Sequence, residues 1–411
     1  MAQIVFYFII GIIVFEFVFE RILEFLNFKS LTSVLPSELH DVSNQEKYEK
    51  AILYQKEYSR FDFFSSSFNF VLIMLMFFFG GFAWIDSFVR QFSENEIIIA
   101  LLFFGTIMIA LKIVDIPLSY YATYKIEEKY NLNNTTLTTF FSDIIKGVLL
   151  TVIIGGAVLW LIVWFYLNTQ QFFWLYAWVF VSAFSLFMAM FYSTLIVPLF
   201  NKQTPLEDGE LKDAILLFCK KVDFELDNVF IIDGSKRSSK GNAYFTGLGS
   251  KKRIVLYDTL IQSLTTDEIV AVLAHEIGHY KRKHIISSII TGIIQTGLIF
   301  YILSIFISQT VLSEALGAGQ HSFHLALITF SILFSPISTI INLALNYFSR
   351  KNEYEADLFA TLHFNGEHLI NALKKLSMQN LSNFTPHRFY VFVNYSHPTL
   401  LQRIEYIRKN K

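Results

Sequence analysis

Apolar residues along this chain gather in long blocks separated by polar connections, instead of recurring at the spacing of an amphipathic helix or strand. Seven blocks are long enough to cross the roughly 30 Å hydrocarbon layer of a bilayer as helices. The pattern therefore predicts a mainly α, polytopic membrane protein with seven transmembrane helices. The predicted spans are Ile4 to about Ile22, Phe68 to Val89, Ile97 to Leu118, Ile144 to Leu167, Phe172 to Leu195, Ile285 to about Ile307, and Ala326 to about Leu345.

The charges of the connections predict the orientation of these spans. Lys and Arg are concentrated in residues 27–62, 120–130, 201–284 and the tail after residue 350, whereas the links near Asn168 and from Val311 to Phe323 contain none. The positive-inside rule places the basic connections in the cytoplasm, so the N-terminus lies outside and the C-terminus inside. The first block has no basic segment before it and no small-residue cleavage site after it, which indicates a retained span and not a signal peptide.

The predicted topology divides the chain into four segments. Residues 1–200 contain the first five spans, 201–284 a cytoplasmic polar segment, 285–349 the last two spans, and 350–411 a second cytoplasmic polar segment. No internal repeat and no Gly/Ser-rich or Pro-rich linker separates them. We therefore expect one compact membrane-embedded unit.

Composition excludes several classes of protein. Of 411 residues, 54% are hydrophobic and only 16% are charged, against about 25% in soluble domains, which excludes disorder and an ordinary soluble enzyme. The 33 Lys and Arg balance 34 Asp and Glu, so there is no basic field for nucleic acid, and we expect no nucleic-acid partner. Cys219 is the single cysteine, which excludes a disulfide framework within the chain.

The first cytoplasmic segment contains a metal-binding motif, His275-Glu276-Ile277-Gly278-His279. A capping box that begins at Thr265 predicts a helix through the motif. Positions i and i+4 share one helix face, so both imidazoles can bind one zinc ion, and Glu276 can act as general base on a water activated by the metal. The alternative is two histidines and a glutamate on a solvated helix face.

A catalytic zinc site usually has three protein ligands and one open position, so a third ligand is required. We propose Glu353, because two membrane crossings after His279 return the chain to the same side of the membrane. Asp357, one helical turn later, can accept a hydrogen bond from a ligand imidazole and fix its tautomer. Alternatively, Glu353, Glu355 and Asp357 only solvate a helix at the membrane surface. The sequence predicts one Zn²⁺ per chain.

These residues also carry a resemblance to a known family. The HEIGH motif, followed by Glu353-Tyr354-Glu355-Ala356-Asp357 and Ser396-His397-Pro398, resembles the type I CAAX prenyl proteases, which are integral membrane zinc metalloendopeptidases. It is more distantly similar to the HtpX-type membrane proteases. Residues 126–136, 198–206 and 242–247 resemble the CAAX group specifically, and the likeness covers roughly residues 120–404.

The resemblance implies a fold in which seven tilted helices enclose an intramembrane chamber, with a cytoplasmic zinc metalloprotease region at its end. It implies that residues 201–284 and 350–411 are the two catalytic segments. It also assigns roles residue by residue. The zinc ligands are His275, His279 and Glu353, the general base is Glu276, Asp357 supports a ligand, His397 stabilises the oxyanion, and Arg403 orders the site or holds substrate.

Residues Asn242 to Phe245, followed by the alternating segment Arg253 to Tyr257, predict a small β-hairpin. In related metalloproteases an edge strand at this place binds the extended substrate backbone. We therefore expect Asn242, Ala243, Tyr244 and Phe245 to contact substrate, mainly through Asn242. The alternative is a hairpin that only supports the histidine helix.

The expected activity is hydrolysis of peptide bonds in membrane-associated or lipidated proteins at the bilayer. The resemblance implies removal of C-terminal residues from prenylated proteins, in the endoplasmic reticulum membrane if the chain is eukaryotic. A composition typical of an AT-rich genome favours a bacterial inner membrane and a role in membrane protein quality control. The alternatives are a seven-span transporter or receptor with structural zinc, and a catalytically silent protein that binds clients. Glu276 beside the first histidine favours hydrolysis over both.

Overall fold

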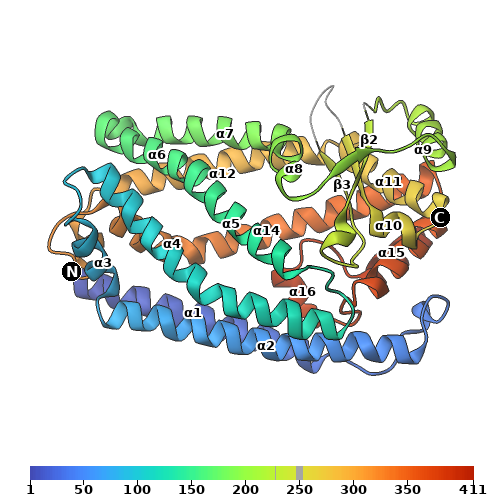
Figure 1. The fold of residues 1–411 in the computed structure, drawn as a ribbon, viewed down its shortest axis with the longest axis horizontal. Helices are drawn as coiled ribbons and strands as arrows, with labels where there is room; N and C mark the ends of the chain where they lie inside the picture. Colours follow the sequence, from blue (N-terminus) through green and yellow to red (C-terminus); the bar gives the residue numbers. More distant parts are fainter. Residues whose placement is uncertain (227, 247–252) are drawn as a thin grey trace.

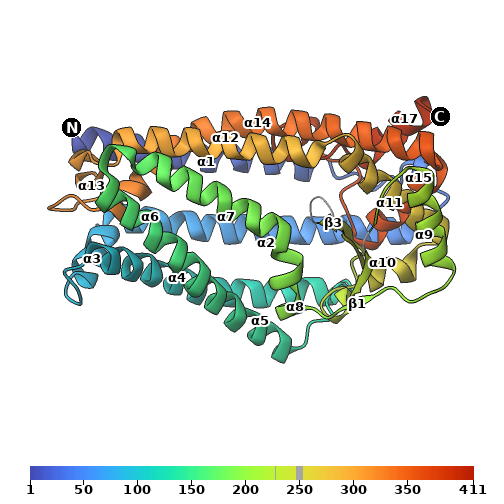
Figure 2. The same cartoon turned by 90° about the horizontal axis from the view of Figure 1, so that it is seen from above.

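The computed structural model describes residues 1–226, 228–246 and 253–411. Long helices occupy most of the elongated molecule, and a smaller region of short helices and strands lies at the end marked by the C-terminus (Figures 1 and 2). Within the described residues, six helices are long and apolar enough to cross a membrane, which confirms a mainly helical, multi-pass membrane protein. They are Ala2–Lys29, Gln45–Phe78, Glu96–Glu127, Leu137–Phe200, His284–Phe306 and Phe323–His363.

The fourth of these helices folds back on itself. At Gln170 the backbone adopts φ 44°, and the chain reverses direction. The ring of Phe165 before the turn then stacks on Tyr176 after it, with centroids 5.8 Å apart. The predicted blocks at 144–167 and 172–195 are therefore the two arms of one element. It comprises α5 (Leu137–Leu150), a π-helical turn (Thr151–Gly155), α6 (Gly156–Thr169), α7 (Phe173–Leu195) and α8 (Val197–Phe200).

The predicted boundaries of the second span were wrong. The long helix α2 runs from Gln45 to Phe78, and a left-handed Gly80 (φ 65°) separates it from the short α3 (Gly81–Val89). Much of the expected loop at residues 27–62 is therefore helical. Its Lys and Glu residues resemble a polar connection, but Tyr48 and Tyr54 on the same helix are buried against the C-terminal region. These tyrosines pack on residues far away in the chain, so a search for long apolar blocks does not detect the helix.

One continuous helix, α14 (Phe323–His363), runs from the membrane region into the C-terminal region (Figure 1). The predicted seventh span at 326–345 is only its first half. Since no break intervenes, the residues after 350 are held at a fixed angle to the membrane helices. The remaining long helices are α1 (Ala2–Lys29), α4 (Glu96–Tyr121, continued by a π-helical turn, Ala122–Glu127) and α12 (His284–Phe306), and α13 (Thr310–Glu314) connects α12 to α14.

The C-terminal region contains a four-stranded mixed sheet instead of an isolated hairpin. The strand order is β1-β2-β4-β3, where β2 and β4 are parallel and the other pairs are antiparallel. The two predicted strands are β3 and β4; residues 247–252 between them lie outside the described part of the chain. The sequence did not predict β1 and β2, because their pairing is not local. The strands are β1 (Gln203–Pro205), β2 (Asn228–Ile232), β3 (Ala243–Thr246) and β4 (Arg253–Tyr257).

The two polar segments, residues 201–284 and 350–411, contribute to one hydrophobic core. Phe218 and Leu256 from the first segment pack in the same cluster as Phe359 and Ile370 from the second. Cys219 is buried in this cluster as a small apolar residue. The helices around the core are α9 (Glu210–Lys221), α10 (Asp258–Ser263), α11 (Thr266–Lys281), α15 (Gly366–Gln379) and α17 (Leu400–Lys409), and α16 (Arg388–Asn394) lies against α1 and α14.

Candidate metal centre

The histidine motif lies on α11, which begins as the sequence predicted. The Thr265 side chain accepts a hydrogen bond from the N–H of Glu268, and the Glu268 side chain accepts one from the N–H of Thr265, so the capping box is confirmed. Gly278 faces α14, where an added Cβ would lie 3.1 Å from both Ala356 Cα and Phe359 Cβ. The absence of a side chain at Gly278 therefore allows the backbones of α11 and α14 to approach closely.

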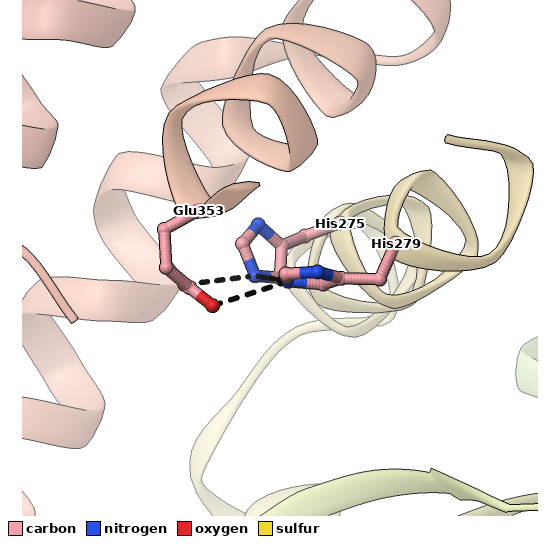
Figure 3. A group of neighbouring side chains, drawn as sticks. All are labelled: His275, His279 and Glu353. Atoms are coloured by element: carbon pink, nitrogen blue, oxygen red, sulfur yellow. Dashed lines mark hydrogen bonds and ion pairs between the residues drawn. The ribbon is translucent and has the colours of Figure 1, made fainter. Parts of the chain in front are cut away.

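This approach brings the carboxylate of Glu353 onto the two imidazoles (Figure 3). Nε2 of His275 lies 3.2 Å from Nε2 of His279, and these nitrogens lie 3.4 and 3.2 Å from the Glu353 carboxylate oxygens. Atoms bound to one tetrahedral zinc at 2.0–2.2 Å are separated by about 3.3–3.6 Å. The three side chains therefore have the separations of three ligands of one zinc ion.

The chemistry of the donors also fits a cation. His275 and Glu353 are buried, with 7% and 4% of their surface exposed, and Oε2 of Glu353 has no hydrogen-bond partner among the described residues. A buried carboxylate oxygen without a partner is costly. A divalent cation between the three side chains would satisfy it.

Asp357 and Arg403 lie on the Nδ1 side of the His275 ring. Asp357 Oδ1 lies 2.9 Å from Nδ1 of His275, and the Arg403 guanidinium donates to both Asp357 oxygens at 2.9 and 2.6 Å. Burial and the Arg403 charge lower the pKa of His275, but the nearby carboxylates of Asp357 and Glu353 outweigh them and raise this pKa to about 9. Because the Arg403 side chain is only 12% exposed and is paired with Asp357, its position suits ordering the site and not holding substrate.

Glu276 and His397 are more exposed than the buried residues His275 and Glu353. Glu276 is half-buried and lines a cleft of about 480 Å³ together with His279, Phe245 and Asn352. The His397 side chain is 62% exposed and places Nε2 3.3 Å from Oε1 of Glu353. Its Nδ1 lies 2.9 Å from the Ser396 hydroxyl. If Nδ1 accepts from that hydroxyl, Nε2 carries the proton and is a donor beside Oε1 of Glu353.

The predicted substrate strand is β3, which forms an edge of the sheet beside α11. Phe245 faces the cleft, whereas the Tyr244 hydroxyl faces Ser193 of α7, 3.5 Å away. Asn242 is exposed, and its side-chain oxygen accepts from the N–H of Ala243. The structure therefore brings Phe245, and not Asn242, to the cleft that contains Glu276.

Two sequence models of protein families match the chain. One, described as CAAX prenyl protease N-terminal with five membrane helices, matches residues 24–202, and the other, peptidase family M48, matches residues 205–411. The chain belongs to peptidase family M48. The resemblance read from the motifs is thereby confirmed. This M48 peptidase is a membrane metalloendopeptidase, and a transporter or receptor is not its class.

Similarity to individual proteins extends over nearly the whole chain of this M48 peptidase. The CAAX prenyl protease 1 homolog of Arabidopsis thaliana is 35% identical, with 97% of this chain and 96% of the relative aligned. The CAAX prenyl protease 1 of Saccharomyces cerevisiae is 34% identical over 98% and 95% of the two chains. The crystal structure of S. mikatae Ste24p superposes with a TM-score of 0.93 at 32% identity and covers 99% of each chain.

Two residues beside the candidate metal site, His284 and Glu355, were not predicted as site residues. His284, the first residue of α12, places Nδ1 3.1 Å from Nδ1 of His279. Glu355, which the spacing assigned to the opposite helix face from Glu353, lies 3.2 Å from Nε2 of His284. A histidine five positions after His279 was the only signal in the sequence, and its direction depends on the turn between α11 and α12.

Proposed function

We propose that this M48 peptidase binds one zinc ion per chain through His275, His279 and Glu353 and hydrolyses peptide bonds with Glu276 as general base. The observation that carries this proposal is the set of short separations within the cluster: 3.2 Å between the two Nε2 atoms, 3.4 Å from His275 Nε2 to Oε2 of Glu353, and 3.2 Å from His279 Nε2 to its Oε1. Two ligands come from α11 and one from α14, so the site exists only when these helices pack together. Zinc bound there would supply Lewis-acid activation of water and of the peptide carbonyl.

The surrounding side chains then have distinct tasks. Glu276 accepts a proton from the attacking water and delivers it to the departing amine. His397 donates from Nε2 to the oxyanion that develops on the carbonyl oxygen. Asp357 accepts from Nδ1–H of His275 and so fixes the tautomer that exposes Nε2, while Arg403 holds Asp357 in place.

We propose that the substrate lies extended along the free edge of β3. A strand there would form main-chain hydrogen bonds with Ala243–Thr246 and bring its scissile bond to the cleft between Phe245 and Glu276. Phe245 also packs on Tyr280 of α11, with ring centroids 5.7 Å apart, so it supports the histidine helix as well. Asn242 stays a proposed contact at the beginning of the strand.

The names of the eukaryotic relatives support prenylated proteins as substrates, cleaved near the C-terminus. We propose this activity ahead of general quality control of membrane proteins, and hence the endoplasmic reticulum membrane ahead of a bacterial one. A catalytically silent role is disfavoured, because Glu276 is present and faces the cleft beside the ligands.

For the membrane, we propose seven crossings, with the N-terminus outside and the metal centre in the cytoplasm. The element Leu137–Phe200 counts twice because it reverses at Gln170. We also propose that the helices enclose a water-filled chamber. Asn342 supports it, since it is an exposed polar residue within a predicted span, where such side chains usually face a bundle interior or water. Lys112 and Asp115 do not add to this support, because they pair with each other at 3.0 Å.

The substrate proposal is tested with the purified protein in detergent or nanodiscs and a pair of peptides that differ only in a prenyl group on the cysteine. Mass spectrometry reads the new C-termini. Selective cleavage on the C-terminal side of the prenylated cysteine supports the proposal, and equal cleavage of both peptides at many positions supports quality control instead. Glu353→Gln is the matched control, because it should lose zinc and cleave neither peptide.

A further inference from the structure

The Nδ1 atoms of His275 and His279, which face away from the proposed metal position, contact different groups. Nδ1 of His275 faces the carboxylate of Asp357 directly, at 2.9 Å. Nδ1 of His279 faces another imidazole, that of His284, at 3.1 Å, and His284 in turn faces the carboxylate of Glu355 at 3.2 Å. The imidazole of His284 therefore lies between His279 and the carboxylate of Glu355, whereas no side chain lies between His275 and Asp357.

The chemistry of imidazole fixes the direction of these hydrogen bonds when a metal is bound. Nε2 of His279 faces Glu353 and His275 and must present a lone pair to a metal, so its proton is on Nδ1. That N–H requires an acceptor, and Nδ1 of His284 is the atom in place. His284 then carries its own proton on Nε2, where Oε2 of Glu355 can accept it. Each proton has one position, and both ring orientations are fixed.

The backbone is bent to place His284 there. Helix α11 ends at Lys281, and Lys283 adopts the left-handed conformation, with φ 61°, immediately before α12 begins at His284. A left-handed residue other than glycine costs about 1–2 kcal/mol. The turn directs His284 back toward α11, where only 7% of its surface is exposed. The strained backbone of Lys283 is explained if the protein requires the His284 side chain at this position beside His279.

We propose that His284 and Glu355 are positioning residues for His279, which fix its tautomer and ring orientation and so increase its affinity for zinc. This inference rests on the zinc site proposed above. The Glu355 side chain is 38% exposed and also lies 4.0 Å from Lys351, whereas the Asp357 side chain is fully buried. Solvent therefore screens Glu355 more than Asp357, and His284 contributes more than Glu355 does.

Zinc affinity of the metal-free protein tests the proposal without relying on activity. The dissociation constant is measured by competition with a chromophoric chelator for the wild type, His284→Phe, His284→Gln and Glu355→Ala. Phe fills the space but cannot accept a hydrogen bond. Gln can accept from His279 with its oxygen and donate to Glu355 with its nitrogen. His368→Phe is the matched control, because His368 lies on α15, where its ring contacts Asp267 and Phe364.

We expect His284→Phe to weaken zinc binding about 10–100-fold, the range found when a group that orients a metal-binding histidine is removed. His284→Gln should recover most of this loss, Glu355→Ala should show a smaller loss, and His368→Phe none. The absorption spectrum of the Co²⁺-substituted protein should change in His284→Phe and return in His284→Gln. Thermal unfolding in excess chelator identifies any variant that has lost its fold, and Glu355→Ala then provides the test.

The proposal is overturned if His284→Phe is folded and binds zinc within twofold of the wild type. It is also overturned if Gln and Phe weaken binding equally, because packing alone would then explain the contact. A different result marks failure of the zinc site itself: in that case the wild type would bind zinc no more tightly than Glu353→Gln. Because His284 also lines the cleft, a variant that raises KM at unchanged zinc affinity would assign it to substrate binding instead.

Discussion

The carboxylate of Glu353 lies 3.2 Å from Nε2 of His279, although two membrane helices separate these residues in the chain. The contact depends on the close packing of α11 against the second half of α14. Any change that moves these two helices apart should therefore act on the metal before it acts on the fold of the membrane region.

Gly278→Ala should weaken zinc binding. The new methyl group would lie 3.1 Å from backbone and Cβ atoms of α14, which cannot rotate away, so the two helices must separate by a few tenths of an ångström. Overpacking of this kind costs about 1–3 kcal/mol. Zinc content and thermal unfolding of the purified variant provide the measurement. Gly292→Ala is the control, because an added Cβ at Gly292 has no atom within 4 Å among the described residues; equal behaviour of the two variants would contradict the prediction.

Arg403→Met should destabilise the protein even without zinc. Above pH 9, where His275 is neutral, the guanidinium is the cation that neutralises the fully buried Asp357, and removing one partner of a buried pair costs about 3–5 kcal/mol; below pH 9 the protonated His275 lessens this cost. Thermal unfolding in excess chelator measures this loss. Arg403→Met with Asp357→Asn should be more stable than Arg403→Met alone, since the uncompensated charge is then absent. A single variant as stable as the wild type would show that Asp357 is neutral or paired otherwise.

Zinc affinity should depend on pH through His275. Its pKa is raised from 6.5 to about 9 in the metal-free protein, so its charged form stabilises that protein at low pH, and this stabilisation is lost as pH rises through about 9. Zinc must displace this proton below pH 9. The logarithm of the zinc dissociation constant should therefore fall by about one for each pH unit between 7 and 8.5. A dissociation constant that is flat over this range would contradict the raised pKa.

The proposed chamber predicts which spanning residues contact water. Asn342 and Ile340 are both exposed on α14 but point to different sides, because they are two positions apart on a helix. In a Cys219→Ala background within nanodiscs, Asn342→Cys should react with a charged, membrane-impermeant thiol reagent, and Ile340→Cys should not. Equal labelling of the two positions, or labelling of Ile340→Cys alone, would contradict a chamber on the side of Asn342.

The sequence predicted the parts of the site that depend on local chemistry. The capping box at Thr265 and the histidine spacing predicted the helix that carries the proposed ligands, and the two membrane crossings after His279 predicted that Glu353 returns to the same side. It did not predict β1 and β2, since their pairing partners are distant in the chain, or the helical identity of residues 45–62, whose buried face is formed by tertiary contacts. His284 was missed for a similar reason: its direction is set by the backbone of Lys283, which no propensity rule predicts for lysine.

The most direct measurement is the cleavage rate of Glu276→Gln at a zinc content equal to that of the wild type. We predict that this variant keeps one zinc per chain, because Glu276 is not a proposed ligand, and that it cleaves a prenylated peptide about 10²–10⁴ times more slowly, because no side chain accepts the proton from water. A zinc-loaded Glu276→Gln protein that cleaves at the wild-type rate would contradict this prediction.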